Sequence, residues 1–184
     1  MTVRPEAGEI YLDTLNEGDA ATLHLWRQDP DVSEGSLAYP FATGIEAERE
    51  WIRSFAPQGT PRDLCLAVRA RGSDALLGYC QLRAIDWIAR TAEFGIVIGP
   101  AQSRGRGLGK RALALTRDYA VGRLGLRRLW LRVVAFNSAA IALYESNGFV
   151  LEGRMPRHAH SRGGLHDVLI YGWEAPARPA ADAD

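Results

Sequence analysis

The sequence has few cysteines, a single lysine and no long apolar run among its 184 residues. Its two cysteines, Cys65 and Cys80, each lie in an apolar segment, so a disulfide framework and a structural zinc site are excluded. Every apolar run is far shorter than the ~20 residues that span a bilayer. The first ten residues lack the apolar core of a secretory signal, and the formal net charge is zero. We therefore expect a cytoplasmic protein with no membrane or nucleic-acid partner.

Positive charge is nevertheless concentrated in one segment. Residues 101–132 contain nine basic side chains and a single acid, Asp118. Such a run is often only a solvated helix face. It also suits a polyanionic ligand, because clustered charge of one sign attracts the opposite sign. The charge pattern by itself leaves both interpretations open.

Hydrophobic periodicity predicts seven strands and four helices in the order β-α-α-β-β-β-α-β-α-β-β. The expected strands span 10–15, 64–69, 76–86, 90–98, 128–134, 149–154 and 166–174, and the expected helices span 19–28, 44–55, 107–121 and 138–146. Antiparallel hairpins followed by a βαβ-like crossover predict an α/β (α+β) fold. Its sheet would be mixed, strongly twisted and mostly antiparallel, with helices on both faces. Residues 1–174 form one expected domain, and 175–184 a flexible tail.

A glycine-rich stretch at 102–110 joins an expected strand to an expected helix. Glycines allow backbone N–H groups to turn toward an anion, and a helix start adds partial positive charge, so this stretch suits a pyrophosphate. A Walker A loop is excluded, because Arg104 stands where its first glycine belongs and Arg111 where its hydroxyl belongs. A dinucleotide fingerprint is excluded because Lys110 replaces its third glycine.

The stretch does match Gln-x-x-Gly-x-Gly, from Gln102 to Gly107, which resembles the acyl-CoA loop of the GNAT acetyltransferases. Three further blocks, 92–98, 134–137 and 140–149, resemble that family in the same order. The segment that begins at His166 is similar to the ribosomal-protein N-terminal acetyltransferase branch, and the core is also similar to spermidine N-acetyltransferase. The chain therefore resembles the GNAT family over nearly its whole length, and a GNAT fold with about seven strands is expected.

This resemblance implies acetyl-CoA as the cosubstrate, no metal, and direct attack of a primary amine in a ternary complex. Backbone amides of the loop would hold the CoA pyrophosphate, with charge added by Arg104 and Arg106. The strand at 96–98 would hydrogen-bond the pantetheine arm and aim an amide at the thioester carbonyl, an oxyanion contact worth roughly 3 kcal/mol. The implied coenzyme-binding residues are Ile96, Val97, Ile98, Gln102, Arg104, Gly105, Arg106, Gly107, Leu108, Gly109, Lys110 and Asn137.

Two residues are implied in catalysis. Tyr144 would protonate the departing thiolate, since a phenol with a pKa near ~10 can donate to a thiolate whose thiol has a pKa near ~8.5. The alternative is a core tyrosine packed beside Phe149. Glu93 would act as the base, directly or through water, and its alternative is a solvated charge. Asn137 could contact pantetheine, cap the following helix, or do both.

The remaining candidates concern a metal and the acceptor site. His158 and His160 are expected in a turn with no third ligand within reach, so no metal is expected there. Asp86, Trp87 and Arg162 could line the acceptor site.

The acceptor stays open among a protein N-terminal α-amine, an antibiotic or other small-molecule amine, and a nucleotide-linked amino sugar. A polyamine needs converging carboxylates, but Gln81 stands where the spermidine enzymes carry an acid. Two alternatives lie outside the enzyme class. One is an acyl-CoA-binding regulator without turnover, and the other is a nucleic-acid-binding module that uses 101–132. The resemblance also allows a homodimer.

Overall fold

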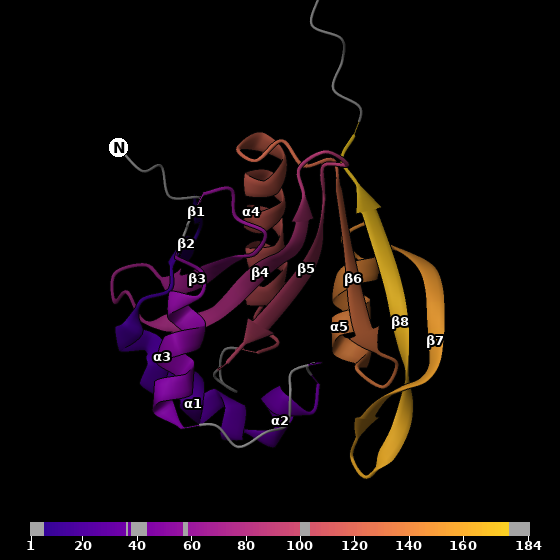
Figure 1. Ribbon diagram of the computed structural model, residues 1–184, viewed down its shortest axis with the longest axis horizontal. Coiled ribbons are helices and arrows are strands. Elements are labelled where there is room, and N and C mark those ends of the chain that lie inside the picture. Colours follow the sequence, from indigo (N-terminus) through magenta and orange to yellow (C-terminus); the bar gives the residue numbers. More distant parts are fainter. Residues whose placement is uncertain (1–5, 36, 38–43, 57–58, 100–103, 177–184) are drawn as a thin grey trace, which may run out of the picture.

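A single eight-stranded sheet with the order β1-β2-β3-β4-β5-β6-β8-β7 forms the centre of the computed structural model (Figure 1). The structure describes residues 6–35, 37, 44–56, 59–99 and 104–176. The strands are β1 (Glu6–Ala7), β2 (Ile10–Thr14), β3 (Leu64–Ala70), β4 (Leu76–Asp86), β5 (Thr91–Ile98), β6 (Arg128–Val134), β7 (Val150–Ser161) and β8 (Gly164–Glu174). The helices are η1 (Glu17–Asp19), α1 (Ala20–Gln28), α2 (Pro30–Ser33), α3 (Ile45–Arg53), α4 (Leu108–Gly122) and α5 (Ser138–Glu145).

All seven expected strands and all four expected helices are present, and the two-residue β1 is an addition. The short helix α2 is also additional, and it begins at Pro30, where the missing N–H of proline costs no helical hydrogen bond. Thr43, the expected cap of α3, and most of the expected tail lie outside the described residues.

The expected turn at His158 and His160 is wrong, because both residues lie within β7. Pro156 is followed by Arg157 with a φ of 51°, a combination typical of a turn. Here it belongs to an irregularity between Met155 and Ala159, after which pairing with β8 resumes. A bulge of this kind bends a strand without ending it.

The two middle strands, β5 and β6, are the parallel pair, and they pair over a short length. Thr91, Ala92 and Glu93 lie opposite Arg128, Leu129 and Trp130. Beyond Glu93, β5 continues with β4 while β6 continues with β8. Figure 1 shows the two strands separating toward the carboxyl end of β5. The strand pairing is therefore interrupted at the centre of the sheet, as the family resemblance implied, and we call this break in pairing the opening.

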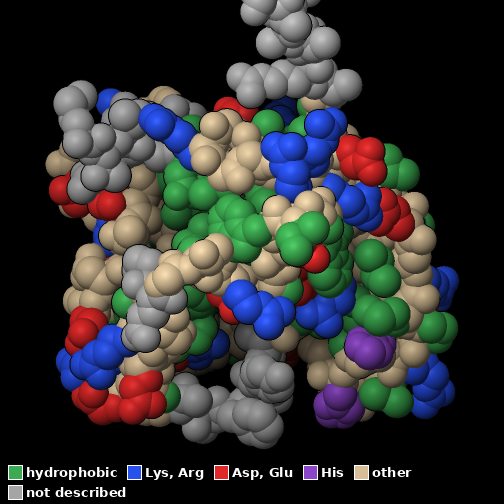
Figure 2. All heavy atoms as spheres, turned by 45° about the horizontal axis from the view of Figure 1, so that its top comes forward, with side chains coloured by type: hydrophobic (Ala, Val, Ile, Leu, Met, Phe, Trp, Pro, Cys, Tyr) green, Lys and Arg blue, Asp and Glu red, His purple; other side chains and the backbone are tan. Residues whose placement is uncertain are grey.

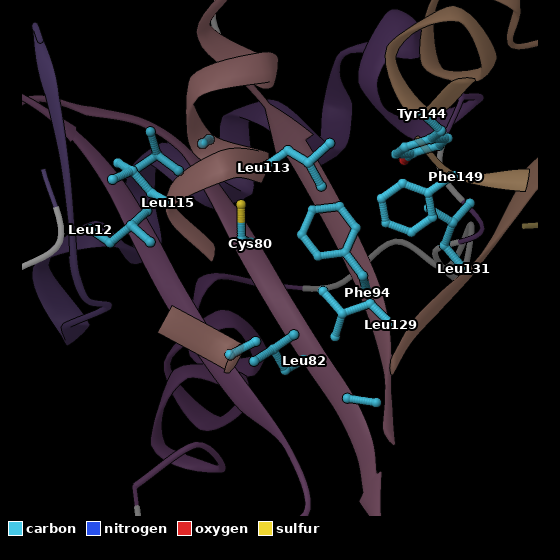
Figure 3. Packing of buried hydrophobic residues seen from close by; sticks show 14 of the residues in the cluster. Leu12, Cys80, Leu82, Phe94, Leu113, Leu115, Leu129, Leu131, Tyr144 and Phe149 are labelled. Carbon is cyan, nitrogen blue, oxygen red and sulfur yellow. The ribbon is translucent and has the colours of Figure 1, made fainter. Parts of the chain in front are cut away.

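Helices cover the two faces of the sheet. The helix α4 packs its buried side chains, among them Leu113 and Leu115, against β-strand residues that include Cys80, Leu82 and Phe94 (Figure 3). The opposite face carries a smaller cluster, in which α1 and α3 pack on the β4 residue Tyr79. Successive strand residues alternate between these faces. None of the described helices is long and apolar enough to cross a membrane.

Candidate active site

The start of α4 presents a surface at the open end of the sheet whose backbone geometry suits an anion. Gly105 and Gly107 have φ values of 73° and 75°, in the left-handed region that favours glycine. Gly107 is the N-cap and supplies no side-chain cap, and the first turn of α4 contains no acid. The free N–H groups of this turn and the helix dipole therefore favour an anion. Gln102 lies outside the described residues.

The basic residues around this surface differ in their contacts. The Arg104 guanidinium donates to the carbonyl oxygens of Gly99 at 2.9 Å and Ile98 at 3.4 Å. It also pairs with the Asp29 carboxylate at 3.0 Å. Arg104 thus ties the end of β5 to the end of α1, whereas Arg106 and Lys110 are exposed. Exposed cations beside the helix start are free to meet the charge of a phosphate.

The expected basic face at 101–132 is divided among several sites. Arg117 lies over the Trp173 ring at 4.9 Å, and Arg128 pairs with Glu152. Arg132 contacts Glu93 in the middle of the sheet. These three arginines therefore contact different parts of the molecule and do not belong to one continuous surface.

The part of β5 that faces the opening carries Ile96, Val97 and Ile98. On one edge these residues pair with Cys80, Tyr79 and Gly78 of β4. On the other edge, no strand of the described chain pairs with them. Backbone groups on that edge can therefore hydrogen-bond a ligand that lies between β5 and β6.

Tyr144 lies on α5, beside the point where the strands separate. Its ring meets Phe94, the first residue of β5 beyond the parallel pairs, with ring centroids 6.5 Å apart, and Phe149 at 5.8 Å (Figure 3). Among the described residues, none hydrogen-bonds its hydroxyl. Burial raises the pKa of Tyr144, so the phenol remains protonated at neutral pH. It is therefore both a core side chain and an available proton donor.

Glu93 is buried rather than solvated, and two arginines hold it. Its Oε1 accepts from Arg132 Nε at 2.9 Å and from Arg83 Nη2 at 3.1 Å. Its Oε2 accepts from Arg132 Nη2 at 3.4 Å, so this oxygen is the less engaged of the two. Neither arginine was identified as a site residue from the sequence. What could have identified Arg83 is the strand register, because Arg83 on β4 lies directly opposite Glu93 on β5.

Asn137 makes two hydrogen bonds within the protein. Its Oδ1 accepts from Ala140 N at 3.1 Å, which caps α5 as expected. Its Nδ2 donates to the Gly35 carbonyl at 3.0 Å, which links α5 to the segment after α2. Because the Nδ2 group carries two N–H donors, a hydrogen bond from this amide to pantetheine does not require the loss of the one to Gly35.

All three candidate acceptor residues make contacts within the protein. The Asp86 carboxylate accepts from the backbone N–H groups of Ile88 and Ala89 in the β4–β5 turn. The Trp87 indole donates to the Pro61 carbonyl at 2.8 Å. This turn lies at the closed end of the opening, away from the first turn of α4, and Arg90 within it donates to the Gly125 carbonyl just after α4. Arg162 instead pairs with Glu34 near Gly35, on the open side.

The two cysteines are buried and unsuited to nucleophilic catalysis. Burial raises the pKa of Cys80 to about 12, and it also raises the pKa of Cys65. Neither thiol would ionise at neutral pH, which favours direct attack by the acceptor over a cysteine acyl intermediate. The described residues contain no group of three or more His, Cys, Asp or Glu side chains that could hold a metal.

The sequence and the fold are both similar to known acetyltransferases. Spermidine N(1)-acetyltransferase of Escherichia coli (strain K12) is 30% identical over 168 residues, which covers 91% of this chain and 82% of that protein. The Vibrio cholerae enzyme of the same name is 27% identical over 160 residues, covering 87% and 90%.

Two solved structures share the fold. Spermidine N-acetyltransferase from Vibrio cholerae in complex with CoA and spermine has a TM-score of 0.82 at 24% identity, with 90% of this chain and 95% of that chain covered. RimL, an α-N-protein acetyltransferase in complex with coenzyme A, has a TM-score of 0.79 at 21% identity, with 94% and 98% covered. The sequence model of the acetyltransferase (GNAT) domain matches residues 9–150. The chain therefore belongs to the GNAT family of N-acetyltransferases.

Proposed function

We propose that this protein transfers an acetyl group from acetyl-CoA to a primary amine by direct attack in a ternary complex. The observation that carries the proposal is the opening between β5 and β6, which begins directly beyond Glu93. The amide-rich start of α4 lies at its wide end, and Tyr144 lies beside Phe94 at its narrow end.

The coenzyme would bind along this opening. The amides of residues 104–110 hold the pyrophosphate, with charge from Arg106 and Lys110. A cavity of about 650 Å³ beside the start of α4 is lined in part by Arg71, Arg106 and Arg111, and it suits the phosphorylated nucleotide end. The pantetheine arm lies between β5 and β6, where it hydrogen-bonds the unpaired edge of 96–98.

Chemistry then occurs at the narrow end. The amine nitrogen attacks the thioester carbonyl carbon and forms the C–N bond, while an N–H group on the free edge of β5 stabilises the oxyanion. The C–S bond breaks, and Tyr144 donates its proton to the sulfur. Burial penalises the phenolate and the thiolate alike, so the proton transfer does not require a strongly acidic phenol.

The amine must lose a proton before or after attack. Glu93 accepts it through water at Oε2, the less engaged oxygen. The Arg83 and Arg132 guanidinium groups help by disfavouring the ammonium form of a bound amine, because like charges repel. An amine with a pKa near 10.4 is less than ~0.1% neutral at pH 7, so this help matters most for such acceptors.

A screen for release of free CoA thiol from acetyl-CoA tests the proposal across peptides, polyamines, aminoglycosides and amino sugars. Calorimetry with CoA is run in parallel. Release with at least one amine class, lost in Tyr144→Phe, is the expected result. Absence of CoA binding would overturn the proposal, and binding without release in every class would make the protein an acyl-CoA-binding regulator.

A polyamine acceptor is the second candidate, and the names of the relatives favour it. Spermidine would be the preferred acceptor in the same screen if this candidate holds. The charges around the opening weigh against it, because two arginines, Arg83 and Arg132, face the single carboxylate of Glu93 there.

A further inference from the structure

The acceptor side of the opening carries more positive than negative charge. Across β4 and β5, Arg83 lies opposite Glu93 and Gln81 lies opposite Gly95, so all four positions share one face of the sheet. This is the face of Tyr79, on which α1 and α3 pack. The other face is closed by α4 and the apolar core around Phe94. An acceptor that reaches the thioester from outside the coenzyme site must therefore pass these side chains.

The Glu93 carboxylate pairs with two guanidinium groups, those of Arg83 and Arg132. Arg83 and Arg132 reach Glu93 from the two strands on either side of β5. The arginine side chains are 38% and 34% exposed, whereas Glu93 is 7% exposed. An approaching ligand thus meets the guanidinium groups before the carboxylate. Figure 2 shows basic side chains near the middle of the molecular surface, next to apolar ones.

Hydrogen-bonding capacity also remains on the arginines. Arg83 Nε is buried and has no hydrogen-bond partner among the described residues. Glu93 accepts hydrogen bonds from Nη2 of Arg83 and from Nε and Nη2 of Arg132. The unused donors of two neighbouring guanidinium groups suit a carboxylate or a phosphate, which accept several charge-assisted hydrogen bonds at once.

Gly95 leaves space beside these donors. A Cβ at this position would lie 3.7 Å from Gln81 Oε1 and 4.0 Å from Arg83 Nη2. The space is directly over the strand that lines the opening, one residue beyond Phe94. An acceptor whose amino end lies at this point would have its anionic group next to Arg83.

Carboxylates that could bind a polycation are scarce around this space. The described ion pairs Arg27–Glu48 and Arg162–Glu34 are each balanced one to one. The partly undescribed segment 36–44 contains no acid. Outside the described ranges the acids are Asp182 and Asp184, near the carboxyl end of the chain, and the side chains of Glu6 and Asp31 are likewise not described. A polyamine would keep further positive charges close to Arg83 and Arg132 without compensation.

We propose that the acceptor is an amine that carries a carboxylate or phosphate near its amino nitrogen, held by Arg83 and Arg132. This inference rests on the proposed acetyltransferase function and specifies its acceptor class. Charge-assisted contacts to two arginines would favour such an acceptor over its neutral analogue by about tenfold or more in kcat/KM.

Matched acceptors test the inference through thiol release. Phosphoethanolamine is compared with ethanolamine, alanine with alaninamide, and spermidine serves as the polycation. We expect each anionic amine to exceed its neutral partner at least tenfold at low salt, and spermidine to be the poorest acceptor. The two anionic groups separate a phosphate preference from a carboxylate preference. Equal rates within both pairs, or a preference for spermidine, would overturn the inference while leaving the acetyltransferase function intact.

Single substitutions test whether the preference for anionic acceptors depends on Arg83 and Arg132. Arg83→Gln and Arg132→Gln each leave one arginine to pair with Glu93, so the buried carboxylate stays compensated. Each should reduce the anionic-to-neutral ratio by about tenfold. Arg128→Gln is the control, because Arg128 lies on the same strand as Arg132 but pairs with Glu152 and Glu174 at its far end. An unchanged ratio in both test variants would contradict the assignment.

Binding is measured separately from turnover. Phosphoethanolamine and ethanolamine are titrated by calorimetry into the full-length protein saturated with CoA. Tighter binding of phosphoethanolamine, weakened in Arg132→Gln, supports the inference even if neither amine is acetylated. Equal binding of the two, or binding that Arg132→Gln leaves unchanged, overturns it.

Discussion

Glu93 and Trp130 form the last residue pair that joins β5 to β6. Up to this pair the sheet is continuous, and beyond it the two strands follow different partners. The pair therefore determines where a thioester could lie within the sheet. It also places Glu93, with its two arginines, at the narrow end of the opening.

Replacement of Tyr144 by phenylalanine should lower kcat while leaving CoA affinity near that of wild type. The hydroxyl has no hydrogen-bond partner among the described residues, so its loss costs little stability. We expect a fall in kcat of about 100-fold, typical of the loss of a general acid. Steady-state kinetics and CoA calorimetry measure the two effects. Unchanged turnover at saturating acceptor would remove Tyr144 from the mechanism.

The pH dependence of kcat gives a second check on Tyr144. A general acid must be protonated, so its contribution is lost only as pH rises through its pKa. Because burial raises the pKa of Tyr144, this loss should fall above pH ~10, the ordinary value for a phenol. Initial rates between pH 7 and 10 should show no decline that depends on Tyr144. A decline present in wild type and absent from Tyr144→Phe would contradict the expectation.

Gly107→Val should abolish CoA binding. Gly107 has a φ of 75°, which a β-branched residue adopts only with strain, and it precedes the first turn of α4. The new side chain would both crowd the pyrophosphate and distort the amides that hold it. Gly122→Ala, at the other end of α4, is the control, because a Cβ there meets no atom within 4 Å. Calorimetry measures the CoA affinity of both variants, and circular dichroism confirms that they are folded. Retained affinity in Gly107→Val would count against the loop assignment.

The limits of sequence-based prediction are visible in β7 and in the arginine pair. Strong periodicity predicted most elements to within a few residues. Pro156 and Arg157 predict a turn when the sequence is considered alone. The structure instead places them in a bulge of β7, which depends on pairing with β8. The loop at 102–110 and Tyr144 could be proposed as site residues because their motifs are local. Arg83 and Arg132 lie far apart in the sequence, and only the register of three strands brings both to Glu93.

Glu93→Gln should lower both the free energy of unfolding and the rate of turnover. The substitution leaves two neighbouring guanidinium groups without their shared carboxylate, and a partly buried charge that loses its partner is costly. The arginines retain some solvent contact, so we expect a loss of about 2 kcal/mol, which corresponds to a fall in Tm of roughly 4–8 °C. Arg83→Gln should lose less, because Arg132 still pairs with Glu93. Equal melting temperatures for wild type and Glu93→Gln would show that the cluster contributes little to folding.

Gly95→Ala tests the space over β5 with the smallest available change. The φ of Gly95 is not in the left-handed region, and an added methyl group would make only ordinary contacts with Gln81 and Arg83. Stability and CoA affinity should therefore stay near wild type, while the methyl group occupies the volume proposed for the amino end of the acceptor. We expect KM for the acceptor to rise several-fold, with a smaller change in KM for acetyl-CoA. Gly153→Ala is a matched control. Gly153 lies on the outer strand β7, and its added Cβ would meet the Ile170 side chain at a similar distance of 3.5 Å. If Gly95→Ala and Gly153→Ala gave the same acceptor KM as wild type, the acceptor would have to approach the thioester by another route.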